Sequence, residues 1–195
     1  ITFAELLRNW SVVYVANAVG AVGLALTVYL AHHGSMNGGA VGAAYVKIAA
    51  AKIALPFWEA FFKGVLCNVL VCLAVWLAMA GHTVVDKIVA IVFPISAFVA
   101  AGFEHCVANM YFIPLGMLLA DSAAVPATVN AASVGWAGLV SNLVPVTLGN
   151  IAGGSGMVAL VYYMVYRRPA LIEPRSAAER TRATDAPADT SETAD

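Results

Sequence analysis

The chain has 195 residues, of which 62% are hydrophobic and 11% are charged, with a formal net charge of -1 and a mean hydropathy of +0.84. An ordinary soluble domain carries about 25% charged residues, so this composition excludes a soluble globular protein. The net charge gives no basis for binding nucleic acid. The apolar runs are continuous rather than alternating, which predicts an all-α polytopic membrane protein and not a barrel.

The sequence predicts a transmembrane domain, residues 1–168, that contains four hydrophobic runs long enough to cross a membrane. About 20 apolar residues are needed to cross the hydrocarbon core, and the runs lie at about 10–31, 57–79, 88–119 and 145–166. Pro145 is expected in the first turn of the last helix, where proline is favoured. Between the first two runs, a glycine-rich loop leads into an amphipathic segment that bears Lys52.

The third run is longer than one span requires and holds polar residues at its middle. Gly102 precedes Glu104 and His105, and Asn109 follows one turn later. An interrupted polar helix is tolerated at membrane depth only where it faces protein or a water-filled cavity, and ionisable groups there are candidate functional sites. We therefore predict a helix broken near 99–104 that carries the selectivity site of a small-anion channel.

The two ends of the chain differ from its hydrophobic middle. Residues 169–195 are mostly small, polar and charged, which predicts a disordered tail. Lysine and arginine are more frequent on the side of the membrane that holds residues 1–9, 80–87 and the tail, so a cytoplasmic C-terminus is expected. The chain opens on Ile1 close to a hydrophobic run, and we expect a fragment of a longer protein.

His105 is the main candidate for a functional side chain. A histidine within a span is rare, and its imidazole titrates near physiological pH unless burial keeps it neutral. Such a ring could donate a hydrogen bond, or a whole proton, to a small carboxylate. The alternative is a structural histidine that bonds a neighbouring helix.

Three further polar residues are candidates around His105. Glu104 points to another side of the helix, and we expect its carboxylate to bind free N–H groups where the helix restarts; a pore-facing Glu104 would oppose anion passage. Asn109 either supports His105 or bonds another helix. Asn68, in the preceding span, could donate an amide N–H to the same ligand.

Two residues are candidates for the mouth of a pore. Lys52 could concentrate anions, or it could be a solvated interfacial lysine. Phe98, about two turns before His105, could form an apolar collar, or it could be an ordinary core residue.

Other classes of function have less support from the sequence. No nucleophile is poised beside His105 and no HExxH motif occurs, so an enzyme is not expected. One histidine within the spans argues against a haem held by two histidines. No cofactor or metal is expected, and a purely structural membrane subunit stays open.

Two stretches resemble the formate–nitrite transporter family, on its formate-channel branch. GFEHCVANMYFIPLGM, at 102–117, resembles the family's fifth-span motif, and GVLCNVLVCLAVW, at 64–76, resembles its second signature. The resemblance implies an aquaporin-like inverted repeat of three plus three spans with a broken helix in each half. Only the last four of six spans would be present, so we expect the complete protein, and not this chain alone, to form a sealed pore.

The resemblance also implies partners and roles. Family members are homopentamers of the inner (plasma) membrane that pass formate, nitrite, hydrosulfide or related monovalent anions, often with a proton. Seven residues match positions around the pore: the central histidine (His105), the amide beside it (Asn68), the anion-attracting lysine (Lys52), the outer and inner constrictions (Phe98 and Val71) and two motif positions (Glu104 and Asn109). Either His105 protonates the anion, or it stays neutral and the anion passes passively.

Overall fold

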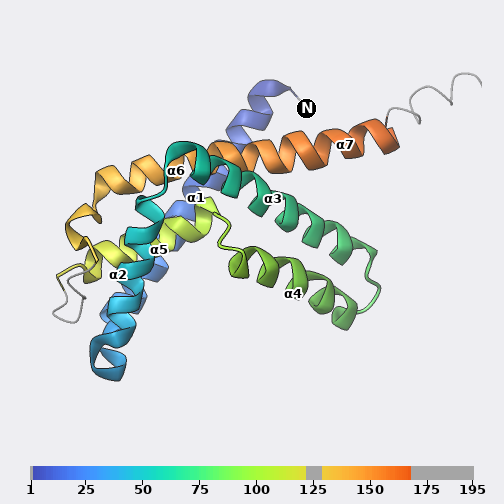
Figure 1. The fold of residues 1–195 in the computed structure, drawn as a ribbon. Coiled ribbons are helices and arrows are strands. Elements are labelled where there is room, and N and C mark those ends of the chain that lie inside the picture. Colours follow the sequence, from blue (N-terminus) through green and yellow to red (C-terminus); the bar gives the residue numbers. More distant parts are fainter. Residues whose placement is uncertain (1, 122–128, 168–195) are drawn as a thin grey trace, which may run out of the picture.

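The structure is a computed structural model that describes residues 2–121 and 129–167; the tail predicted at 169–195 lies outside them. Within the described ranges the chain is helical and has no strand, so the predicted all-α fold is confirmed (Figure 1). The α-helices are α1 (Phe3–Leu30), α2 (Ala40–Ile53), α3 (Phe57–Ala80), α4 (Val84–Ala100), α5 (Cys106–Leu119), α6 (Trp136–Ile151) and α7 (Leu160–Tyr162).

Shorter helical turns join these elements. A 3-10 segment, His33–Gly39, connects α1 to α2, and a second, Ala131–Ser133, precedes α6. Wide π-helical turns, Ala152–Ala159 and Tyr163–Arg167, flank α7. They continue the axis of α6, so a single rod runs from residue 136 to residue 167 (Figure 1).

Within residues 2–121 and 129–167, three helical segments are long and apolar enough to cross a membrane: Phe3–Leu30, Phe57–Ala80 and Trp136–Tyr166. α4 and α5 contain 17 and 14 residues, and each is shorter than the roughly 20 residues that one span requires. The two short helices follow one another with residues 101–105 between them. The third hydrophobic run is therefore two half-helices joined by an irregular segment.

The starts of two helices add to the sequence-based picture. α1 begins at Phe3, before the run expected to cross the membrane at about 10–31, because Thr2 and Glu5 form a capping box that bonds the first free N–H groups. Pro145 lies inside α6 and not in its first turn. Proline removes one backbone hydrogen bond, a loss that membrane helices tolerate when neighbouring helices compensate for it.

The helices pack in pairs. α3 contacts both α4 and α6, while α5 contacts both α1 and α2. Figure 1 shows α3 and α4 as a hairpin that extends away from the region where α1, α2, α5 and α6 meet. Thr83 and Asp86 form a capping box at the turn of this hairpin. The interruption after α4 thus lies at the other end of the hairpin, against the central helices.

Glycines bring α3 and α6 into close contact. A Cβ on Gly149 would meet the backbone oxygen of Phe61, and a Cβ on Gly153 would meet that of Val65. Small residues let helix backbones approach closely in a membrane. This close approach lets one side chain of the α6 rod reach the backbone of both α3 and the interruption.

The close approach predicts a strong difference between two glycine substitutions. Gly149→Ala should lower the thermal unfolding temperature in detergent, because forced overpacking costs about 1–3 kcal/mol. Gly156→Ala is the matched control, since a Cβ there meets no atom of the described part of the chain within 4 Å. Equal unfolding temperatures for the two variants, measured by circular dichroism, would contradict the tight α3–α6 contact.

Candidate functional site

The site is built on the interruption between α4 and α5. α4 ends in a turn in which Gly102 adopts a φ of +66°, a conformation that glycine reaches without the strain of a side chain. The N–H of Phe103 donates to the carbonyl of Phe98 at 3.0 Å. His105 then precedes the first turn of α5 in extended conformation, so its ring stands at a helix start.

Asn150, from α6, satisfies the backbone that the interruption leaves free. Its Oδ1 accepts from the N–H of Cys106 at 2.9 Å, and its Nδ2 donates to the carbonyl of Glu104 at 3.0 Å and to that of Gly64 at 2.8 Å. The N–H of Glu104 donates to the carbonyl of Lys63 at 3.3 Å. One amide therefore joins α3, α5 and α6 at the break.

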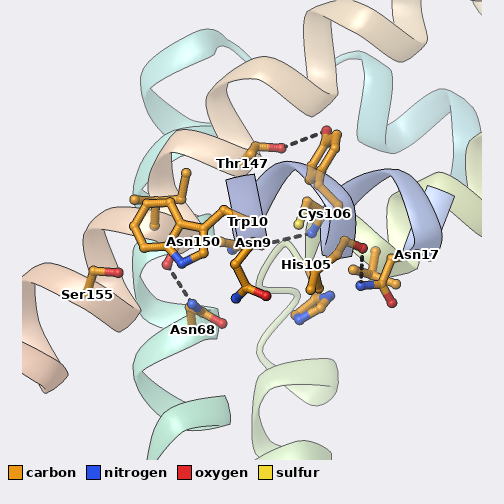
Figure 2. Close-up of a pocket in the computed structure, with 13 residues that line it drawn as sticks. Asn9, Trp10, Asn17, Asn68, His105, Cys106, Thr147, Asn150 and Ser155 are labelled. Atoms are coloured by element: carbon orange, nitrogen blue, oxygen red, sulfur yellow. Dashed lines mark hydrogen bonds between the residues drawn. The ribbon is translucent and has the colours of Figure 1, made fainter. Parts of the chain in front are cut away.

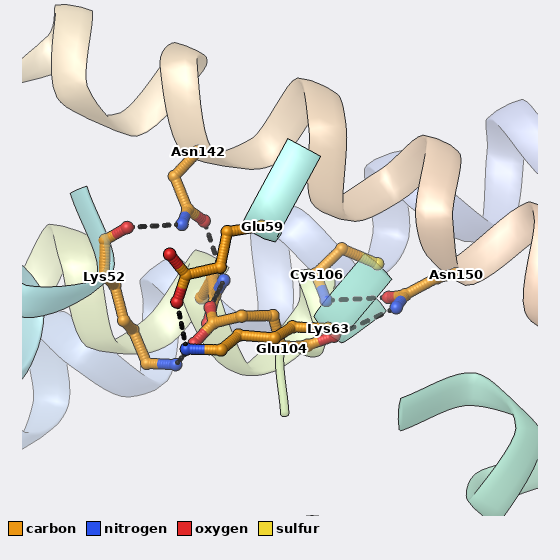
Figure 3. A network of polar contacts seen from close by, with 8 residues as sticks. Lys52, Glu59, Lys63, Glu104, Cys106, Asn142 and Asn150 are labelled. Carbon is orange, nitrogen blue, oxygen red and sulfur yellow. Dashed lines mark hydrogen bonds and ion pairs between the residues drawn. The ribbon is translucent and has the colours of Figure 1, made fainter. Parts of the chain in front are cut away.

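The predicted capping role of the Glu104 carboxylate is wrong, because Asn150 bonds the free N–H of Cys106. Glu104 Oε1 lies 3.0 Å from Lys52 Nζ, and its Oε2 accepts from Asn109 Nδ2 at 2.6 Å (Figure 3). The side chains of Lys52 and Glu104 are 16% and 6% exposed. Lys52 is therefore neither a free cation nor a solvated surface lysine, and it compensates the negative charge of Glu104.

Two asparagines extend this ion pair into a network. Asn109 Nδ2 also donates to Asn142 Oδ1 at 2.7 Å, and Asn142 Nδ2 donates to the carbonyl of Lys52 at 2.8 Å. The backbone N–H of Asn109 donates to the carbonyl of His105, but its side chain bonds Glu104 and another helix. The alternative of an interhelical hydrogen bond thus describes Asn109 better than direct support of the imidazole.

His105 and Asn68, which are 37 positions apart in the sequence, line one cavity of about 310 Å³ (Figure 2). The half-buried imidazole stacks against the Phe98 ring with centroids 6.2 Å apart. Asn68 Nδ2 donates to the backbone oxygen of Asn150 at 2.6 Å. One of its two amide N–H groups is therefore engaged, and among the described residues the second N–H and the oxygen have no partner, so they are available to a ligand.

The cavity includes residues that the sequence did not single out. α1 contributes Asn9, Trp10 and Asn17, and the α6 rod contributes Thr147 and Ser155 (Figure 2). Lys52 and Val71 are not among the lining residues. Polar residues inside apolar runs were the available signal for Asn17, Asn142 and Asn150, but spacing alone did not show that they meet.

An interrupted helix that holds a histidine beside a cavity with several polar side chains, within an all-α bundle, defines a multi-pass helical membrane protein with a polar site at a broken helix. The chain belongs to the formate/nitrite transporter family: the family model described as "Formate/nitrite transporter" matches residues 1–164. The resemblance of its two motif stretches is thereby confirmed.

Relatives and solved structures agree with this assignment. The formate channel FocA of Haemophilus influenzae is 40% identical over 163 residues, which cover 80% of this chain and 57% of the relative. FocA of Escherichia coli strain K12 is 38% identical over 176 residues, which cover 86% of this chain and 62% of the relative. The chain thus spans 57–62% of the length of these curated relatives.

Among solved structures, a pentameric formate channel with formate bound is similar with a TM-score of 0.78 and 35% identity, covering 86% of this chain and 69% of that one. An FNT family ion channel is similar with a TM-score of 0.72 and 32% identity, covering 84% of this chain and 61% of that one.

The buried pair predicts that single substitutions destabilise more than the double substitution. Lys52→Met or Glu104→Gln alone should cost about 3–5 kcal/mol, because each leaves one charge or one partner unmatched in an apolar surrounding. The double variant should recover part of this loss, as measured by unfolding in detergent. Lys63→Met is the control, since the Glu59–Lys63 pair is 48% and 31% exposed and such pairs contribute under about 1 kcal/mol. Additive single effects would contradict a coupled pair.

Proposed function

We propose that this protein is a transmembrane channel or transporter for formate and related small monovalent anions, such as nitrite and hydrosulfide. The observation that carries the proposal is the cavity shared by His105 and Asn68 at a broken helix, in a chain of this family. The relatives named as formate channels support formate as the substrate. Because they are longer, we propose that segments outside this chain complete the pore.

The site offers hydrogen bonds without a fixed net charge. A small anion loses its water when it enters a narrow site, and a bare charge at membrane depth is strongly disfavoured. The second N–H of Asn68 and an N–H of His105 would replace lost water. Lys52 would not hold the anion directly, because its ammonium group already bonds Glu104. The two opposite charges would cancel, and the pair would form a rigid, neutral part of the site behind His105.

We propose that His105 passes a proton to the bound anion, so that the neutral acid crosses the apolar part of the path. Phe98 stacks on the imidazole and would form the apolar collar on one side of it. Val71, about one turn after Asn68 on α3, would form the constriction on the other. A neutral His105 that only donates a hydrogen bond, with passive passage of the anion, is the rival mechanism.

The proposal includes assembly and location. The pentameric formate channel supports a homopentamer with one pore in each protomer and a six-span inverted repeat. The excess of lysine and arginine supports an orientation in the inner membrane with a cytoplasmic C-terminus. A transport role, and not catalysis, accounts for the residues at the break.

Substitution of His105 tests the function and the mechanism together. In liposomes, the full-length wild-type protein should take up formate with acidification of the receiving side. His105→Asn keeps a hydrogen-bond donor but carries no proton, so proton-coupled uptake should fall at least about tenfold, as when a general acid is removed.

The outcomes separate the two mechanisms. Unchanged proton-coupled uptake in His105→Asn would contradict protonation by the imidazole. Formate flux that persists without acidification would favour the passive mechanism. Absence of formate uptake into liposomes that contain the full-length wild-type protein would contradict the proposed function itself.

A further inference from the structure

A second cavity, a groove of about 400 Å³ between α1 and α6, lies next to the one that holds His105. The groove is open to the surface of the described residues, since its lining side chains Val140, Val144 and Leu148 are 59%, 48% and 49% exposed. Tyr14 and Thr147 line both cavities. The other residues of the second cavity are all aliphatic: Leu139, Val140, Leu143, Val144 and Leu148.

Tyr14 and Thr147 meet across the boundary between the two cavities. The Tyr14 hydroxyl and Thr147 Oγ1 are 3.1 Å apart, and the bond joins α1 to α6 (Figure 2). Both side chains are partly buried, where a hydrogen bond is less exposed to competition from water. Asn68 and His105 line the first cavity with this pair, whereas only aliphatic side chains line the second with it.

We propose that the Tyr14–Thr147 hydrogen bond is the partition that limits the size of the substrate. It would keep the aliphatic tail of a larger monocarboxylate out of the groove while the carboxylate is held at His105. Formate has no tail and needs no groove. This inference rests on the proposed function and assigns Tyr14 and Thr147 as specificity-determining residues of the same site.

The chemistry of the groove defines which acid would benefit from its opening. Loss of an ordinary hydrogen bond should let the partition open about 3- to 10-fold more often. Each methylene that then leaves water for the aliphatic groove strengthens binding by about fourfold. An acid with an apolar tail gains from both effects, whereas an acid of the same size with a polar tail gains little.

Propionate and glycolate are the matched probes, because they have equal numbers of heavy atoms and differ by a methyl against a hydroxyl group. Each would be tested as an inhibitor of formate uptake by the full-length protein in liposomes. The variants are Tyr14→Phe, Thr147→Val and the double variant. Thr147→Ser retains the hydroxyl and is the rescue control, and Tyr29→Phe, on an exposed part of α1, is the remote control.

In Tyr14→Phe and Thr147→Val, the half-inhibitory concentration of propionate should fall about 3- to 10-fold, and that of glycolate should change less than about twofold. The double variant should match the single variants, because all three lose the same bond. Thr147→Ser and Tyr29→Phe should behave as the wild type. Unchanged propionate inhibition, or an equal change for both acids, would overturn the partition. Absence of formate uptake by the wild type would instead overturn the proposed function.

Discussion

The structure depends on one buried ion pair, Lys52 with Glu104, at the point where the third span is broken. Burying a carboxylate in an apolar bundle costs free energy unless an opposite charge and hydrogen bonds compensate for the lost water. Lys52 supplies the charge and Asn109 supplies a hydrogen bond to the second oxygen. α2 has 14 residues and is too short to cross the membrane. It is therefore held by a polar contact to the break before α5, as well as by its packing against α5 itself.

The same network explains how an irregular backbone is maintained at membrane depth. Backbone groups without partners are as costly there as unpaired side chains. Asn150 bonds two such groups at the break, the N–H of Cys106 and the carbonyl of Glu104, and it also bonds the carbonyl of Gly64 inside α3, because glycines bring the α6 rod close to α3. The ion pair holds the side chain of Glu104, and the Asn150 amide holds the backbone of Glu104 and Cys106. The orientation of the His105 ring is therefore set by these contacts and not by a regular helix.

Sequence reasoning found the elements whose signals are local. The all-α membrane fold and the family followed from composition and from two motifs. His105 and Asn68 were expected at one site, and they line one cavity. The partners of these residues were harder to predict, because Lys52 and Glu104 are 52 positions apart and Asn150 bonds residues 44 and 86 positions away. The sequence around a lysine in an amphipathic segment looks the same whether the lysine faces solvent or a buried carboxylate. The sequence around Pro145 likewise does not show whether the proline lies at the start of a helix or inside it.

The central claim is that the broken helix holds His105 at an anion site whose fixed charges are already paired. A structure of the full-length protein determined with formate bound tests this claim most directly. The account predicts the carboxylate within hydrogen-bonding distance of the His105 ring and the Asn68 amide, with the Lys52–Glu104 pair intact. Formate bound to a freed Lys52, or a His105 ring that faces lipid with no anion beside it, would contradict the account.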